Sequence, residues 1–372
     1  MSNLSIGIVA SKREEKEFIR FQWRIYPEYP HWVPPLLMDR KKLMDRKKNP
    51  FYAHAEAEFF LARHGDDIVG RIGAIINHNH NKEHNENIGF FGFFECIDDQ
   101  SVADALFDAA KRWLRERGVK TIRGPASPSV NDEFGLLVGG FARPPAVLMP
   151  YNPPYYAPLI EGAGFRKIKD LYSFEVREEK VFSEKFVRVA EMLKKKQNLT
   201  FRPLNMKDFD NEIAQIRELY NRAWQYNWGA VPMTKEEFEA LAKDLKPVVD
   251  PELVLVAESK GEAIGFSLSL PNLNQALIYN KKGYLLPGLA RLMIHKKKIN
   301  EVRIIVLGVV KEQLMTGAGA VLLYETGRRG VERGYPVGEA SWVLEDNVMM
   351  IRAAEFMSGV RTKTYRIYEA SL

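Results

Sequence analysis

Two spacings of apolar residues alternate along the first half of the chain. An apolar residue at every second position predicts a strand, and spacings of three and four predict a helix. Gly65, Asp66 and Asp67 separate two alternating runs and predict a hairpin turn, and Gly118 ends a helical run. The predicted strands are 5–10, 58–62, 68–76, 88–96 and 166–176, with another beginning at 121, and the predicted helices are 12–25, 101–117 and 155–163.

The second half repeats this order of elements. Its predicted strands are 199–202, 253–257, 263–270, 302–310, 337–343 and 362–368, and its predicted helices are 209–224, 320–333 and 347–357. Both halves also carry paired tryptophans followed by Val-Pro, at 23–34 and at 224–232, which indicates an internal duplication of a domain. A charged stretch between the halves is predicted to be helical. The expected domains are 1–178 and 198–372, with a helical linker at 179–197.

Composition narrows the class of protein. The 372 residues allow two or three domains, and 46% hydrophobic residues are enough for two cores. A single cysteine, Cys96, excludes an internal disulfide and is expected to be buried. With no secretory signal or membrane span in view, a cytoplasmic protein is expected. The net charge of +6 indicates an anionic partner, and nucleic acid is disfavoured because no predicted strand face interleaves aromatic with basic residues.

A glycine-rich loop follows the strand predicted at 302–310. Residues 317–320 are Gly-Ala-Gly-Ala and lead directly into a helix. A strand that enters a helix through such a loop directs backbone N–H groups and a helix N-terminus at one place, which binds phosphate. Glycine lets the ligand come closer to the backbone than a Cβ allows. A plain tight turn is the alternative for Gly-x-Gly alone.

The order strand, glycine loop, helix, strand, helix and strand over 302–368 resembles the GNAT superfamily of N-acyltransferases. The loop resembles that family's Gln/Arg-x-x-Gly-x-Gly/Ala motif at Leu314, Gly317 and Gly319. The resemblance implies an α/β (α+β) protein of two tandem GNAT-like domains, each a mixed, mostly antiparallel twisted sheet with helices on both faces. It also implies that acetyl-coenzyme A or a longer acyl-coenzyme A is the cosubstrate, that an amine is the acceptor, and that no metal takes part.

The resemblance implies that only the second half binds coenzyme A. The cofactor-binding residues it implies are Leu307, Gly308, Val309, Thr316, Gly317, Ala318, Gly319, Ala320, Trp342 and Asn347. Leu314 departs from the family's Gln or Arg, and Ala354 stands where the family often has a tyrosine that protonates the leaving thiolate. The equivalent loop of the first half, 97–103, has no glycine. Its Asp98 and Asp99 repel a pyrophosphate and favour capping of the next helix.

Acyl transfer to an amine needs a group that accepts the amine proton and a pocket that holds the amine beside the thioester. Glu345 is the predicted base, with Glu339 and Asp346 as alternatives, although each carboxylate could simply be solvated. The segment 224–229 lies where the family builds its acceptor wall. The predicted substrate-binding residues are Trp224, Asn227 and Trp228, for which a place in the core is the alternative.

No acidic residue occurs from 263 to 300. Within this stretch, apolar residues at 284–289 and 292–294 alternate with Lys281, Lys282, Arg291 and the lysines at 296–298. The pattern predicts an amphipathic element, 279–298, on an anionic membrane surface or at the mouth of a lipid tunnel. An insertion packed on its own domain is the alternative. This combination resembles the bacterial ceramide synthases, GNAT-like proteins linked to N-acylation of sphingoid bases, and implies a peripheral place at the inner membrane face.

The sequence therefore predicts an acyl-coenzyme A-dependent N-acyltransferase. Direct transfer in a ternary complex is expected because no nucleophilic cysteine stands near the glycine loop. Two alternatives remain, long-chain N-acylation of a membrane amino-lipid and a non-enzymatic binder on a decayed GNAT fold. A polar hairpin tip is expected at 77–87, where His78, His80 and His84 lack the carboxylate or cysteine neighbours of a metal site.

Overall fold

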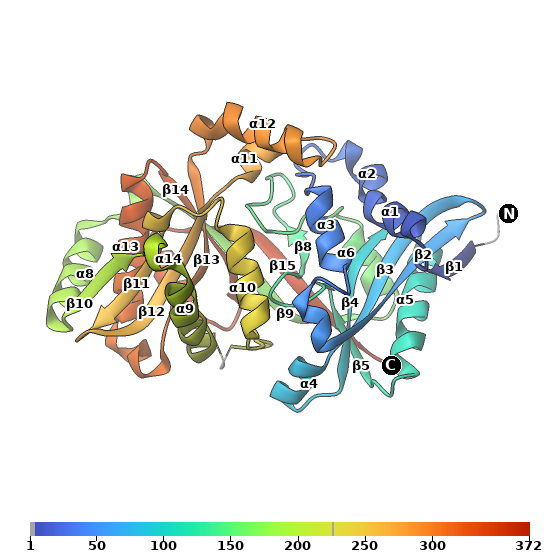
Figure 1. Ribbon diagram of the computed structural model, residues 1–372, viewed down its shortest axis with the longest axis horizontal. Helices are drawn as coiled ribbons and strands as arrows, with labels where there is room; N and C mark the ends of the chain where they lie inside the picture. Colours follow the sequence, from blue (N-terminus) through green and yellow to red (C-terminus); the bar gives the residue numbers. More distant parts are fainter. Residues whose placement is uncertain (1–3, 225–226) are drawn as a thin grey trace. The chain divides into compact units, whose positions relative to one another are not determined.

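Each unit of the fold takes residues from both halves of the chain (Figure 1). The computed structural model describes residues 4–224 and 227–372. The first unit runs to Asp170 and adds Ala276–Ile294 and Lys363–Leu372, and the second comprises Leu171–Gln275 and His295–Thr362. Most of the last strand of the chain, Val360–Ser371, thus belongs to the first unit. Most of the strand Arg166–Arg177, at the end of the first half, belongs to the second unit.

The first unit is built on a mixed sheet. Its strands, in spatial order, are β1 (Leu4–Ile8), β2 (Ala55–His64), β3 (Asp67–Asn77), β4 (Ile88–Cys96), β5 (Thr121–Gly124) and the part of β15 (Val360–Ser371) that starts at Lys363. All neighbours are antiparallel except β4 and β5. β8 (Leu136–Gly139) also pairs with β15, and β6 (Ala126–Ser127) pairs with β7 (Glu133–Phe134).

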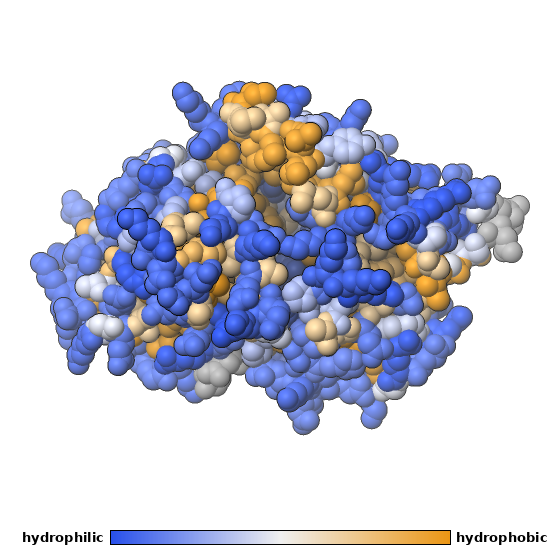
Figure 2. Space-filling view, viewed as in Figure 1, coloured by the Kyte–Doolittle hydropathy of each residue, from blue (hydrophilic) through white to orange (hydrophobic). Residues whose placement is uncertain are grey.

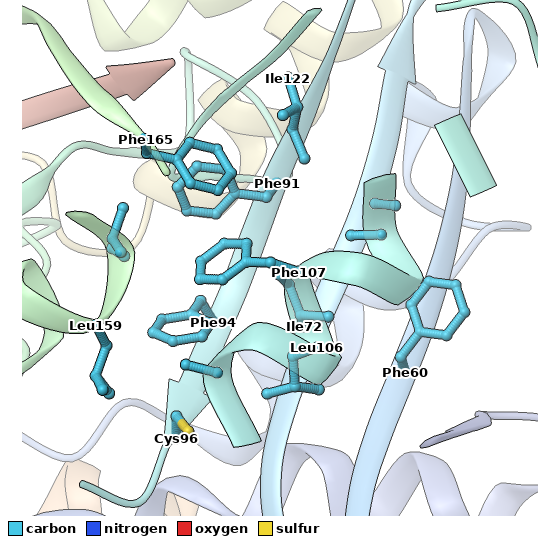
Figure 3. Close-up of a cluster of buried hydrophobic side chains, with 14 of the residues drawn as sticks. Phe60, Ile72, Phe91, Phe94, Cys96, Leu106, Phe107, Ile122, Leu159 and Phe165 are labelled. Atoms are coloured by element: carbon cyan, nitrogen blue, oxygen red, sulfur yellow. The ribbon is translucent and has the colours of Figure 1, made fainter. Parts of the chain in front are cut away.

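Helices cover both faces of this sheet because its strands alternate apolar side chains toward each face. On one face, α5 (Gln100–Arg115) packs Leu106 and Phe107 against Phe91 and Phe94 of β4, as Figure 3 shows. On the other, Phe18 of α1 (Lys12–Arg20) contacts Phe59 and Phe93. The remaining helices of this unit are α2 (Gln22–Ile25), α3 (Leu37–Met44), α4 (His78–His84), α6 (Tyr156–Gly162), α11 (Asn274–Leu277), α12 (Leu285–His295), η1 (Tyr26–Glu28) and η2 (Pro50–Ala53).

The second unit has the same design. Its strands, in spatial order, are β9 (Arg166–Arg177), β14 (Val337–Leu344), β13 (Glu301–Val309), β12 (Glu262–Pro271), β11 (Val254–Ser259) and β10 (Leu199–Pro203). Only β13 and β14 run parallel. Its helices are α7 (Glu178–Val181), α8 (Glu184–Lys196), α9 (Phe209–Trp224), α10 (Lys235–Leu245), α13 (Ala318–Glu332), α14 (Val348–Phe356), η3 (Met206–Asp208), η4 (Pro251–Leu253), η5 (Lys296–Lys298) and η6 (Lys311–Thr316).

Neighbouring residues of β13 show that helices lie on both faces here too. Trp224 of α9 packs over Gly308, whereas Val309 faces Gly319 of α13. Because successive residues of a strand point to opposite faces, α9 and α13 cover opposite sides of the sheet. The predicted fold class, tandem mixed sheets with helices on both faces, is confirmed.

The region of three histidines contains a helix that the pattern of residues does not predict. The predicted hairpin tip between the antiparallel strands β3 and β4 holds the short helix α4, His78–His84, because the Asn77 side chain accepts from the His80 N–H and caps a helix. His80 is buried against Phe90, and burial lowers its pKa to about 4, so its ring is neutral at pH 7. Among the described residues, no three His, Cys, Asp or Glu side chains are placed to hold a metal ion.

Candidate functional site

In each unit, one strand has a bulge close to the point where its pairing with a parallel neighbour ends. These strands are β13, next to β14, and β4, next to β5. In the second unit, Leu268 and Ser269 of β12 pair with Val306 and Ile304, so β13 holds one extra residue at Ile305. The parallel ladder between β13 and β14 ends at Ile304 and Ala340. A bulge bends a strand and ends its pairing, so the two strands part beyond this point.

The neighbouring strand bends as well. The pairing of β14 with β9 shifts between Ala340 and Val343, and Trp342 has a left-handed backbone with φ of 59°. Residues 304–308 of β13 are half-buried rather than sealed in the core. In the second unit, the pairing of the parallel strands β13 and β14 therefore stops before either strand ends, and the region between their unpaired ends is called the opening here.

The glycine loop follows the unpaired end of β13 along the chain. After β13, η6 leads to Gly317, whose φ of 85° is left-handed, and α13 begins at Ala318. The Thr316 hydroxyl accepts the Ala318 N–H at 3.2 Å and donates to the Gln313 carbonyl at 2.7 Å. The first turn of α13 has no acidic residue. Its N-terminus thus presents N–H groups and a positive dipole end beside the opening.

Gly319 lies inside the first turn of α13 rather than in the loop, because the helix begins two residues earlier than the predicted 320. A Cβ on Gly319 would meet only Val309 Cγ2, at an ordinary 3.8 Å. The protein's own packing therefore does not require glycine here. Glycine also destabilises a helix by about 1 kcal/mol relative to alanine, so neither packing nor stability explains it.

Trp224, a predicted substrate-binding residue, packs against β13, the strand that carries predicted cofactor-binding residues. A Cβ on Gly308 would lie 2.5 Å from Trp224 Cη2, so only glycine allows this approach. The indole stacks on Tyr220, with ring centroids 5.1 Å apart, and is half-buried. Asn227 and Trp228 lie in the following turn and are half-buried, and Gln225 and Tyr226, also in the predicted wall, lie outside the described residues.

The other predicted site residues follow β14. Trp342 Nε1 is buried without a hydrogen-bond partner among the described residues, and the Arg303 guanidinium lies 5.1 Å from a Trp342 ring centroid. Asn347 Oδ1 accepts the Met350 N–H at 3.1 Å and caps α14, which leaves its Nδ2 to donate elsewhere. Glu345 is half-buried in the turn between β14 and α14, and Asp346 beside it is exposed.

The alternative base Glu339 has a different setting. It is 3% exposed and its Oε1 accepts a hydrogen bond from the Ser341 hydroxyl at 2.7 Å. Ala354, at the family's tyrosine position, is buried against Phe174 and Val343. Neither is open to solvent, so Glu339 is less accessible than Glu345 or Asp346.

The first unit has the same bulge but no equivalent opening. β4 pairs in parallel with β5 over Ile88–Phe90 and then bulges near Phe93, whose φ is 52°. The chain returns across this point as β6: a Cβ on Gly92 would lie 1.8 Å from the Ala126 carbonyl oxygen, and the Ser127 hydroxyl accepts the Phe93 N–H at 2.8 Å. The protein's own backbone fills the place where the second unit is open.

The loop before α5 also differs from the loop before α13. Asp99 caps α5 by accepting the Ser101 N–H at 2.8 Å, which confirms the predicted cap. Hydrogen bonding from Ser101 lowers the pKa of Asp99, so a negative charge occupies this helix N-terminus. Sequence reasoning found this charge but not the closing strand β6, which no local pattern marks.

Comparison with known proteins agrees with this geometry. The chain is 38% identical to "Bacterial ceramide synthase" of Caulobacter vibrioides, over 100% of this chain and 98% of that protein. It is 35% identical to "Protein YghO" of Escherichia coli K12, over 97% and 94%. No family model matches the chain.

A solved structure shows the same fold across both units. A tandem GNAT protein from the clavulanic acid biosynthesis pathway superposes with a TM-score of 0.56, covering 99% of this chain and 98% of that one at 13% identity. The repeated sheets, the open parallel pair and the full-length sequence similarity lead to one assignment. The chain belongs to the family of the C. vibrioides ceramide synthase and E. coli YghO, and it has the fold of a tandem GNAT protein.

Proposed function

We propose that the second unit binds an acyl-coenzyme A and transfers its acyl group to an amine. The observation that carries this proposal is the opening between β13 and β14, which ends beside the N-terminus of α13. The first unit, closed by β6 and with Asp99 at its helix N-terminus, is proposed to bind no coenzyme A.

The residues around the opening fit such a ligand. The N–H groups at the start of α13 would hold the pyrophosphate, and glycine at 319 leaves room for its oxygens to approach the backbone. The unpaired Trp342 Nε1 supplies a donor at the strand that borders the opening. Leu314, which stands in the place of a Gln or Arg, is 45% exposed and offers no charge to the phosphates. Binding therefore relies on the backbone more than on side chains.

An acyl-coenzyme A supplies an activated thioester. The amine nitrogen attacks the thioester carbonyl carbon, a C–N bond forms and the C–S bond breaks. Glu345 would accept the proton that the amine loses, and coenzyme A leaves as a thiolate that takes up a proton. The half-buried place of Glu345 at the end of β14 supports this role, because it can meet an acceptor without being sealed in the core.

The acceptor is proposed to be a long-chain amino-lipid of the membrane. The C. vibrioides relative is named a ceramide synthase, and the similarity to it covers the whole chain. Trp224 is half-buried beside Gly308 and packs on Tyr220 and on the buried Phe266, so its exposed part offers an apolar surface that suits a hydrocarbon chain better than a charged peptide.

Replacing Gly319 by alanine is expected to separate stability from ligand binding. The free protein should gain about 0.5–1 kcal/mol, since Ala is the better helix former and its Cβ meets no clash. Affinity for acyl-coenzyme A should fall about tenfold or more, because the new methyl group occupies the space of the phosphate oxygens. Thermal unfolding and calorimetric titration with acetyl-, short-chain and palmitoyl-coenzyme A measure the two effects.

Gly327 provides the matched control, because it lies in the same helix and its Cβ would meet Phe182 Cζ at 3.7 Å. Gly327→Ala should raise stability by a similar amount and leave the affinity unchanged. Equal affinity of wild type and Gly319→Ala would remove α13 from the binding site. A wild-type protein that binds none of the three thioesters would favour a non-enzymatic member of the fold.

A further inference from the structure

Helix α12 is held on the first unit by a narrow, glycine-lined side. The Trp23 indole N–H donates to the Lys281 carbonyl at 2.9 Å, and the Leu37 N–H donates to the Gly283 carbonyl at 2.9 Å. On the helix itself, a Cβ on Gly288 would come 3.1 Å from Leu36 Cδ2. These contacts fix which side of α12 packs on the first unit, so the other side of the helix faces away from these contacts.

The opposite side is apolar and open to solvent. The exposed apolar residues of α12 are Leu285 (40%), Leu286 (76%), Leu289 (46%), Met293 (75%) and Ile294 (65%). Spacings of three and four place Leu285, Leu289 and Met293 on one stripe, with Leu286 beside it. These five residues are called the α12 face here. Figure 2 shows a hydrophobic patch at the place of the helix labelled α12 in Figure 1. A free monomer rarely leaves so many large apolar side chains together in water.

Cations precede and follow the α12 face along the chain. Lys281 and Lys282 precede the helix, Arg291 is exposed on it, and Lys296–Lys298 follow it directly along the chain. No aspartate or glutamate occurs between 263 and 300 to offset them. A second copy of the same face would repel this charge, whereas a layer of anionic headgroups above hydrocarbon matches both the charge and the apolar side chains.

We propose that the α12 face lies on an anionic lipid bilayer, with its leucines and methionine at the headgroup–acyl boundary and its cations among the headgroups. Among the described residues, no helix has the length and apolarity to cross a bilayer, and this mode of binding needs none. Membrane binding is inferred from the exposed apolar residues and the cations alone. Only its benefit rests on the proposed function, because an enzyme bound to the membrane would meet amino-lipid acceptors there.

Flotation with phosphatidylglycerol vesicles tests the proposal on the full chain. Wild type should float at low salt, float less at 0.5 M salt, and stay at the bottom with phosphatidylcholine vesicles. Replacing Lys296, Lys297 and Lys298 together by glutamine should weaken binding about 10- to 100-fold. The pair Leu286→Ser and Met293→Ser should weaken it by a similar factor, because each removes an inserted apolar group.

Matched controls lie elsewhere on the surface. Lys47→Gln with Lys48→Gln removes two exposed cations, and Met192→Ser removes a methionine that is 55% exposed on α8. Both should float like wild type, and all variants should keep the wild-type circular dichroism and melting temperature because every altered side chain is exposed.

Wild type that stays at the bottom at low salt, or Ser variants that float normally, would overturn the proposal. A dimer that dissociates in Leu286→Ser without any flotation would instead assign the face to a second copy. Failure of the proposed function is read separately, from calorimetric binding of palmitoyl-coenzyme A in the absence of vesicles, which the α12 variants should leave unchanged.

Discussion

Replacing Glu345 by glutamine is expected to lower kcat about 10²- to 10⁴-fold while coenzyme A affinity stays nearly intact. Glutamine keeps the size of the side chain and loses the ability to accept the amine proton. The half-buried position in the turn after β14 means that the change should cost little stability. Release of free coenzyme A from palmitoyl-coenzyme A, with a sphingoid base as acceptor, gives the rate, and calorimetry gives the affinity.

Two neighbouring carboxylates make this experiment specific. Asp346→Asn alters an exposed side chain one residue away and should retain most of the activity. A Glu345→Gln variant with the full rate would rule out Glu345 as the base and direct the search to Glu339, whose accepted bond from Ser341 would then have to open. Loss of both coenzyme A affinity and rate would show that Glu345 helps to bind coenzyme A rather than accepting the amine proton.

Elements with strong periodicity could be predicted from the sequence alone. The strand at 88–96 and the helix at 209–224 have the predicted bounds, as β4 and α9. Their patterns are long, and clear breaks bound them, so local preference and burial agree. The short helix α10 escaped prediction although its signal was present. Thr234 and Glu237 form a capping box that a three-residue spacing of Thr and Glu could have revealed.

Features that depend on distant packing could not be predicted. The left-handed backbone of Trp342 and the extra residue at Ile305 open the second unit, yet neither residue type marks a bulge. In the first unit, Ala126 and Ser127 close the matching position through contacts with Gly92 and Phe93, more than 30 residues away in sequence. The glycine loop predicted where phosphate could bind, and these non-local bends distinguish the second unit from the first.

The exchange of final strands is the clearest case of a non-local choice. Apolar alternation predicts that 166–176 and 362–368 are strands, but either could pair with either sheet. In the structure β15 pairs with β5 and β8, and Tyr365, Ile367 and Tyr368 are fully buried there. β9 pairs with β14 in the second unit. Each unit therefore contains a strand that sequence order would assign to the other half.

Deleting residues 363–372 is accordingly expected to unfold the first unit and spare the second. Three fully buried side chains would be lost, each contributing about 2–4 kcal/mol, which approaches the whole stability of a typical domain. The β5 ladder and the bonds from Tyr368 to Glu161 and from Arg366 to Asp170 would go with them. Hydrogen exchange followed by mass spectrometry should show lost protection in β3–β5 and retained protection in β11–β13.

A graded series separates the strand from its single contacts. Tyr368→Phe removes only the hydroxyl that donates to Glu161 at 2.9 Å and should cost about 1 kcal/mol, whereas Tyr368→Ala empties a core position and should cost about 3–5 kcal/mol. Both losses should fall on the first unit, because Tyr368 packs in the same core as Phe91 and Phe107. Faster hydrogen exchange in β10–β13, with β3–β5 still protected, would contradict this assignment. It would show that β15 stabilises the second unit rather than the first. Persistence of coenzyme A binding in the deletion variant would show in addition that the open unit holds its ligand without the closed one.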